Sequence, residues 1–168
     1  RALMGGPDKR TIHYAETLAG DTTVAHASAY CQVLEGLARC QKTARAQTLR
    51  GIALELERLA NHVGDLGARA NDVGFLPTAS FCGRIRGDFL NMTALICGNR
   101  FGRNLLQPGG VRFDLDAHLV DELRKRIDAI ETDVTQAVDL LWITPSVMAR
   151  FENAGPVTTA QCIALGLV

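Results

Sequence analysis

Charged side chains of the kind that bind ligands or move protons gather in one stretch of the sequence, residues 50–72. Glu55 and Arg58 are three positions apart and Arg58 and His62 are four apart, so all three share one face of a helix. Their neighbours are mostly apolar or small, which indicates a helix that is buried on more than one side. Buried ions are costly unless they are paired. We therefore expect these three residues and Arg86 to form a buried ionic network, which either serves structure alone or also touches a ligand or redox partner.

Two further residues could carry proton chemistry. Asp72 lies where the long helical pattern ends, beside a loop that contains Gly74 and Pro77. A carboxylate at this position could cap the next helical turn and do nothing more, or it could handle protons in a cleft. We take Asp72 and His26 as the candidate catalytic residues, although a single histidine in a helix is commonly a packing residue.

The cysteines do not form a metal-binding or disulfide pattern. There are five of them, scattered along the chain without a C-x-x-C pair. This spacing argues against a disulfide framework, a zinc site and an iron–sulfur cluster held by the chain itself. We expect reduced thiols that fill a core, and no metal site. The sequence also lacks the glycine-rich nucleotide-binding motifs and the order of a Ser-His-Asp hydrolase.

Composition limits the class of protein. The 168 residues are formally neutral, 47% hydrophobic and 21% charged, with a mean hydropathy of +0.06. The absence of a basic excess argues against nucleic-acid binding, and no apolar run reaches the ~18–20 residues of a membrane-spanning helix. We expect residues 1–168 to be a single domain. Because the chain starts at Arg1 without a methionine, we also expect it to be the core fragment of a longer subunit.

The apolar periodicity and the residues that start or stop helices predict a mainly all-α fold, a bundle of about four long helices with small irregular or β pieces. Residues 1–20 look irregular, residues 21–143 form the bundle, and residues 144–168 form a C-terminal tail. Within the bundle the apolar spacing predicts four long helices over residues 21–40, 44–70, 79–101 and 116–143. A short extended piece is expected at residues 111–113. The tail is predicted to hold two short helices, near residues 146–152 and 158–165.

Several motifs together resemble one known family. They are Arg45-Ala-Gln, Arg50, Glu55-x-x-Arg58-Leu-x-Asn61-His62, Asp72-x-Gly74, Arg86, Gly98-x-Arg100, Pro108-Gly-Gly-Val-Arg112-x-Asp114-Leu and the segment from Gly155 to Gly166. The set is similar to the large-subunit family shared by the 49 kDa subunit of respiratory complex I and the membrane-bound [NiFe]-hydrogenases, including formate hydrogenlyase and hydrogenase-4. The resemblance covers nearly the whole chain and implies a [NiFe]-hydrogenase large-subunit-like fold.

The resemblance also shows where this sequence departs from the family. Aligning the family's active-site histidine with His26 puts the two nickel-binding cysteines at Ala19 and Thr22, and neither supplies a thiolate. The tyrosine that contacts quinone in complex I would fall near Gly20, which cannot donate its hydrogen bond. Asp72 matches the acidic residue that supports proton chemistry at the quinone site. Gly20, Asp21 and Thr22 would then form the floor of a different cavity, which makes them candidate ligand-binding residues.

Taken together, the resemblance implies a subunit of a membrane-associated oxidoreductase complex, of the NADH:quinone oxidoreductase or hydrogenase-4 type. The chain would shape an electron-accepting, quinone-type cavity beside an iron–sulfur small subunit, on the cytoplasmic side of the inner membrane and in contact with membrane subunits. Quinone would be a substrate and the iron–sulfur cluster would belong to the partner. The chain itself would hold no cofactor, nickel is argued against, and NADH would bind another subunit. The alternative is a structural or assembly subunit that has lost both the nickel and the quinone chemistry.

Overall fold

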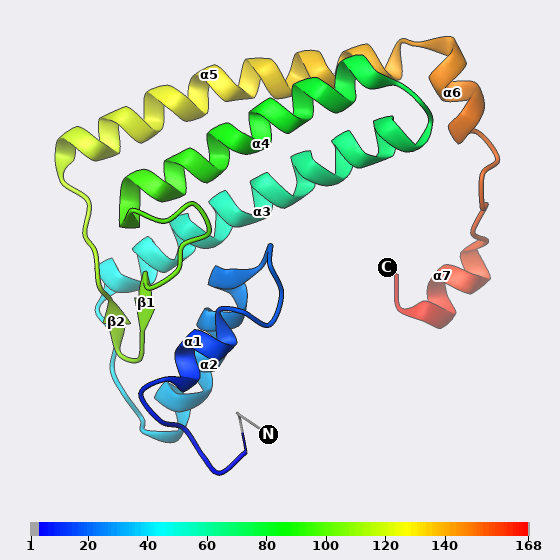
Figure 1. Cartoon of the computed structure of the whole chain (residues 1–168). Coiled ribbons are helices and arrows are strands. Elements are labelled where there is room, and N and C mark those ends of the chain that lie inside the picture. The colour runs from blue at the N-terminus through cyan, green and yellow to red at the C-terminus, as the bar shows by residue number, and fades with distance from the viewer. Residues whose placement is uncertain (1–3, 168) are drawn as a thin grey trace.

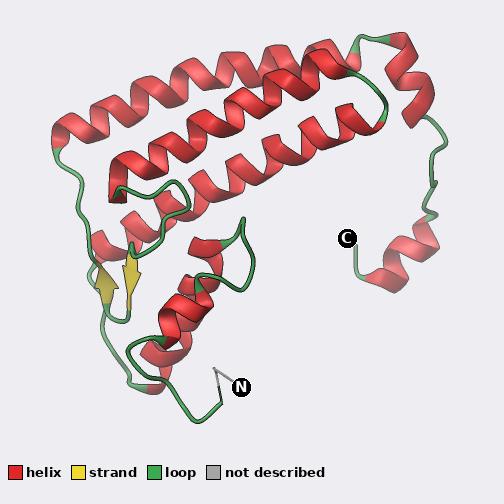
Figure 2. Ribbon diagram, in the orientation of Figure 1, coloured by secondary structure: helices red, strands yellow, loops and turns green. Residues whose placement is uncertain are grey.

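Three long helices lie side by side and form the body of the molecule. The computed structural model describes residues 4–167. In Figures 1 and 2 these three helices run along one another, with two helices and a hairpin near one end and a short helix at the other. In chain order the elements are α1 (Thr11–Ala15), α2 (Thr23–Leu37), α3 (Ala44–Asp72), α4 (Leu76–Cys97), β1 (Leu106–Gln107), β2 (Gly110–Val111), α5 (Ala117–Trp142), α6 (Pro145–Phe151) and α7 (Thr159–Leu165). The expectation of a mainly all-α fold with four long helices is confirmed.

The ends of α3 and α4 follow from local chemistry. At the start of α3 the Thr43 hydroxyl accepts the N–H of Ala46 at 3.2 Å, a side-chain N-cap. Asp72 ends the helix because Gly74, two residues on, adopts a left-handed φ of +73°. The next helix begins earlier than predicted. Pro77 sits in its first turn, where its missing N–H costs nothing.

The later helices also begin at capping residues. The Asp116 carboxylate accepts the N–H of Leu119 at 2.7 Å at the start of α5. Thr158 and Gln161 form a reciprocal capping box at the start of α7. The predicted boundaries of α5 and of both tail helices are therefore confirmed to within one or two residues. Figure 1 shows α7 lying apart from the three long helices.

Two expectations about short elements needed correction. Residues 1–20 were expected to be irregular, but the short helix α1 lies among them. The predicted extended piece at residues 111–113 instead lies slightly earlier, as one half of a two-stranded antiparallel hairpin in which Leu106 pairs with Val111 and Gln107 with Gly110. The hairpin turns at Pro108 and at Gly109, whose φ of +87° only glycine adopts readily.

The core is apolar and lies between α2, α3, α4 and α5. Its fully buried members include Val24, Ile85, Met92, Leu105 and Leu106. A second, small cluster of Ala70, Leu141 and Val147 joins the far end of α3 to α5 and α6.

The cysteines only partly match the expectation of core-filling thiols. All five thiols are free, and Cys31, Cys82 and Cys97 are buried as expected. Cys40, however, is exposed, and Cys162 is half-buried. Burial raises the pKa of the Cys31 thiol to about 11, which leaves it protonated and unreactive at neutral pH. Within residues 4–167, no helix combines the length and apolar character needed to cross a membrane.

Candidate functional site

The ionic network expected from residues 50–72 is on the surface, not in the interior. Glu55 and Arg58 do form an ion pair, at 3.2 Å, but their side chains are 59% and 55% exposed. His62 is exposed as well. Arg86 does not join them, because it points to Asp21 instead. The expectation of burial was wrong because the three residues lie on the exposed face of α3. The buried face of this helix carries Ala53, Leu56, Glu57, Ala60 and Val63.

The two candidate catalytic residues lie far apart. Asp72 is exposed at the last position of α3. His26 is half-buried near the start of α2, and its ring nitrogen Nδ1 lies 2.8 Å from the backbone carbonyl of Thr22 and 2.9 Å from the Thr22 hydroxyl. These bonds fix the imidazole against its own helix.

A small, partly enclosed cavity lies where α2 begins, between that helix, α3 and α4. Asp21 lines it, as does Arg86, while Gly20 and Thr22 do not. The space left for the centre of a water molecule is about 10 Å³, roughly enough for one water. The full lining consists of Asp21, Val24, Glu57, Ala60, Asn61, Arg86, Leu90, Thr93, Arg100 and Phe101.

The outer side of the cavity is formed by an ion pair. Arg86 of α4 donates a hydrogen bond to the Asp21 carboxylate at 3.1 Å, and the Asn61 amide of α3 donates to the Asp21 backbone carbonyl at 2.9 Å. Asp21 is 67% exposed and Arg86 is 31% exposed. The pair therefore bridges the loop before α2 to both long helices while remaining in contact with solvent.

The inner side of the cavity holds a buried carboxylate that the sequence did not single out. Glu57 is 9% exposed and accepts the backbone N–H groups of Val24 at 2.6 Å and Ala25 at 2.9 Å. Burial raises the pKa of Glu57 above its ordinary value, the two N–H bonds and nearby His26 oppose that rise, and Asp21 adds to it. Its position between Leu56 and Arg58 does not show from the sequence that Glu57 is buried. Only the packing of α3 against α2 distinguishes it from exposed Glu55.

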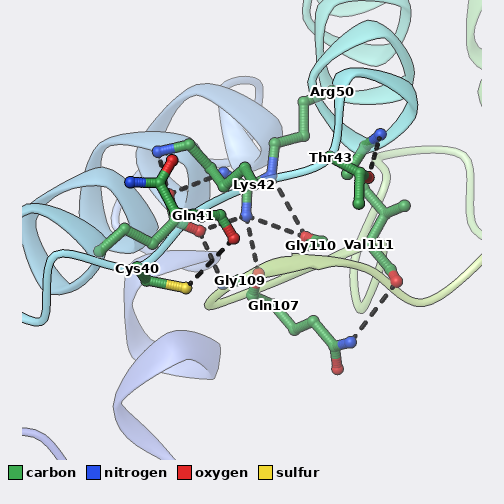
Figure 3. Close-up of polar contacts among 11 residues, drawn as sticks. Cys40, Gln41, Lys42, Thr43, Arg50, Gln107, Gly109, Gly110 and Val111 are labelled. Carbon is green, nitrogen blue, oxygen red and sulfur yellow. Dashed lines mark hydrogen bonds and ion pairs between the residues drawn. The ribbon is translucent and has the colours of Figure 1, made fainter.

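A second buried charged cluster lies at the other end of α2. The guanidinium of Arg50, in α3, forms a two-pronged ion pair with Glu35 at 2.6 and 3.0 Å. It also donates to the backbone carbonyls of Gln107 and Gly110 in the hairpin, at 2.8 and 2.9 Å. Figure 3 shows the Arg50 side chain reaching from its helix to the hairpin loop, with Lys42 beside it.

This cluster joins three segments, namely α2, α3 and the hairpin. Glu35, with a side chain only 1% exposed, also pairs with Lys42 at 3.0 Å and accepts the N–H of Gly109 at 2.7 Å. The hydrogen bonds from the Arg50 guanidinium, and then those from Gly109 and Lys42, lower the pKa of Glu35 to about 2 against the opposing effect of burial, so the carboxylate stays ionised at neutral pH. Both oxygens of the Glu35 carboxylate are bonded to these partners, which points to a structural role for the cluster.

Two positions that the resemblance assigns to the nickel centre supply no thiolate in this chain. The two positions that the resemblance assigns to nickel cysteines are Ala19, which has no donor atom, and Thr22, whose hydroxyl is bonded to His26. Among residues 4–167, no group of three or more His, Cys, Asp or Glu side chains could hold a metal ion.

Comparison with known proteins places the chain in a family. Residues 72–168, more than half of the chain, match the family of the 49 kDa subunit of respiratory-chain NADH dehydrogenase, and the chain belongs to that family. The resemblance drawn from the motifs is thereby confirmed.

Curated relatives come from both branches of that resemblance. A subunit of the Campylobacter jejuni NADH-quinone oxidoreductase is 33% identical over 82% of this chain and 34% of its own length. Subunit 4 of the Thermus thermophilus NADH-quinone oxidoreductase is 32% identical over 85% of the chain and 35% of its own length. Component G of Escherichia coli hydrogenase-4 is 32% identical over 84% of the chain and 25% of its own length. The chain thus spans about a third or less of the length of these relatives.

Proposed function

We propose that this chain is the core of an electron-transferring subunit in a membrane-associated complex of the NADH:quinone oxidoreductase or hydrogenase-4 type. In that complex it shapes a quinone-type cavity beside an iron–sulfur partner subunit on the cytoplasmic side of the membrane, next to membrane subunits. Membership of the 49 kDa family supports this proposal, as do the names of relatives from both branches.

One observation supports the proposal that this chain shapes an acceptor cavity. Residues 19–22 are where the resemblance puts the nickel cysteines and the quinone-contacting tyrosine, and here Asp21 lines a small cavity together with the charged residues Glu57 and Arg86. The cavity has kept donors and acceptors while the nickel ligands are missing. An organic acceptor that gains electrons and protons at the cavity mouth suits these groups better than a metal does.

The roles of the other proposed residues follow from their places. Asp72 is exposed at the end of α3, where a partner subunit can reach it, and we assign it to proton supply from solvent to the complex, outside the cavity itself. His26 is held at the start of α2 and supports the cavity loop through Thr22. Electrons arrive from the iron–sulfur cluster of the partner, and NADH, where it is used, binds another subunit.

Quinone-analogue reduction by the intact complex, purified through this subunit, tests the proposal. We expect reduction by the unaltered complex and slower turnover in Asp72→Asn, with the fold intact. Asp65→Asn is the matched control, because Asp65 is also exposed on α3, where it pairs with Arg69 of the same helix at 3.5 Å. An intact complex with its iron–sulfur clusters loaded that reduces no quinone analogue would exclude the proposed acceptor. Equal turnover in both variants would remove Asp72 from the mechanism.

The alternative, a structural or assembly subunit without chemistry, is favoured by the second cluster. Hydrogen bonds of Glu35 and Arg50 with each other and with the hairpin backbone join α2, α3 and the hairpin. If this alternative holds, Arg50→Met disrupts assembly of the complex, whereas substitutions at Gly20, Asp21 and Thr22 leave turnover unchanged. Slower turnover on changing Asp21, in a complex that still assembles, would exclude it.

A further inference from the structure

The cavity contains one buried carboxyl group. Glu57 is 9% exposed, whereas Asp21, the other acidic residue of the lining, is 67% exposed on its side-chain atoms. The acid assigned above to proton supply, Asp72, does not share this cavity. It lies fifteen residues further along the same helix, which corresponds to roughly 22 Å at the rise of an α-helix. Proton transfer inside the cavity therefore needs a group other than Asp72.

The surroundings of Glu57 suit a group that gains and loses a proton. When ionised, it is stabilised by the N–H groups of Val24 and Ala25 and by the positive end of the α2 helix dipole. When protonated, it avoids the cost of a buried charge. Balanced stabilisation of both forms is what a proton carrier requires, and it agrees with the raised pKa of this carboxyl.

The charged and titratable groups around Glu57 come from every neighbouring element. Asp21 and His26 face it from the loop before α2 and from that helix, Arg86 from α4, and Arg100 from the segment after α4. The cavity that Glu57 lines has room for about one water molecule. Two residues of its lining, Asp21 and Arg86, are in contact with solvent.

We propose that Glu57 supplies a proton to the acceptor that is reduced at the mouth of this cavity, through a water held behind the Asp21–Arg86 pair. The inference rests on the proposed function, because it takes a quinone-type acceptor and electrons from the partner's iron–sulfur cluster. As the acceptor gains electrons, the O–H bond of the Glu57 carboxyl breaks and an O–H bond forms on the acceptor oxygen, with the water as relay. The carboxylate left behind is held by the N–H groups of Val24 and Ala25. Bulk water then returns one proton to Glu57 past Asp21.

Infrared difference spectra of the intact complex, recorded as its iron–sulfur clusters are reduced electrochemically, test this inference without relying on turnover. We expect a protonated-carboxyl band that changes on reduction, that disappears in Glu57→Gln and that persists in Glu55→Gln. Glu55 is the matched control, because it lies two residues away on the exposed face of the same helix. A band unaltered in Glu57→Gln would overturn the proposal.

Turnover gives the second measurement. Glu57→Gln should reduce quinone-analogue turnover at least tenfold and Glu57→Asp should restore part of it, because aspartate keeps the ionisable group. In the unaltered complex turnover should fall as pH rises through the pKa of Glu57, and this limb should be absent from the residual activity of Glu57→Gln. Full activity and an unchanged pH profile in Glu57→Gln would overturn the proposal while leaving the proposed function in place.

The two measurements distinguish a wrong acceptor from a wrong role for Glu57. If the unaltered complex reduces no quinone analogue but the Glu57 band still responds to cluster reduction, the acceptor is wrong and proton exchange at Glu57 stands. If Glu57→Gln fails to assemble, the exposed variant Asp21→Asn replaces it. Removing the negative charge of Asp21 should shift the titration of the Glu57 band to lower pH, and a band whose titration does not shift would overturn the proposal.

Discussion

Glu57 of α3 caps α2, with its carboxylate 2.6 Å from the backbone nitrogen of Val24. The residue at the N-cap position, Thr22, makes no capping bond with its side chain, because its hydroxyl faces His26. A cap donated by another helix satisfies the first N–H groups of α2 and also fixes where that helix lies. The same carboxylate lines the cavity, so one side chain both holds α2 in place and is the proposed proton donor.

Removing this cap should destabilise the fold. Glu57→Ala leaves the buried N–H of Val24 and the partly buried N–H of Ala25 without this partner, and an unsatisfied buried donor costs on the order of 1–3 kcal/mol. We expect the free energy of unfolding to fall by about 2 kcal/mol, measured by urea denaturation at pH 7. Glu55→Ala, on the exposed face, should change it by less than about 0.5 kcal/mol. Equal losses in the two variants would show that the cap contributes nothing.

Arg50 and Arg58 offer a matched comparison of a buried and an exposed arginine on one helix. Arg50→Met leaves the buried Glu35 carboxylate with Lys42 as its one remaining charged partner in the described residues, and breaking a buried ion pair costs about 3–5 kcal/mol. Arg58→Met removes only an exposed pair with Glu55, which is worth less than about 1 kcal/mol. Thermal unfolding of both variants should therefore show a large loss for the first and almost none for the second. A comparable loss for Arg58→Met would restore the buried network expected from the sequence.

The same cluster should make the protein sensitive to acid. The pKa of Glu35 is about 2 in the folded chain, against an ordinary value of 4.5, so the unfolded chain binds more protons between these values. The resulting stabilisation is fully present above pH 4.5 and is lost as pH falls toward 2. A shift of this size corresponds to about 3 kcal/mol.

Urea denaturation between about pH 6 and pH 2, in the unaltered chain and in Glu35→Gln, measures this contribution. The difference in stability between the two proteins should shrink steadily below pH 4.5. A difference that does not depend on pH would show that the ionised form of Glu35 is not the one stabilised by Arg50.

The elements were predictable because their signals are local. Thr43, Asp116 and Thr158 are capping residues that mark helix starts, and Gly74 and Pro145 mark where helices stop or begin. Each of these features acts within a few residues of itself. Helix boundaries therefore followed from the sequence to within a few positions.

The site was only partly predictable because its signals are not local. Asp21 was expected at a cavity floor, and it does line the cavity. That expectation came from the family resemblance, because the residues next to Asp21 in the sequence do not indicate a cavity. Glu55 and Glu57 have similar surroundings in the sequence, and which of them is buried depends on the rotation of α3 against α2 and α4. A shift of two positions on a helix is a rotation of about 200°, which exchanges the buried and exposed faces.

Gly102 provides a test of how tightly the cavity wall is built. Gly102 and Gly98 have nearly the same left-handed backbone, with φ of +71° and +74°, so alanine at either position meets a similar backbone penalty of about 1–2 kcal/mol. A methyl group on Gly98 meets no atom within 4 Å, whereas one on Gly102 would lie 2.6 Å from Cγ2 of Val24. Gly102→Ala should therefore cost about 1–3 kcal/mol more than Gly98→Ala in urea denaturation.

The excess cost at Gly102 should also appear in function. Val24 lines the cavity and donates its N–H to Glu57, so a displaced Val24 moves the group that holds the Glu57 carboxylate. Quinone-analogue turnover should be lower in a complex with Gly102→Ala than in one with Gly98→Ala, at a temperature where both are folded. Equal turnover, despite the measured difference in stability, would mean that the wall of the cavity can move without disturbing the proton path.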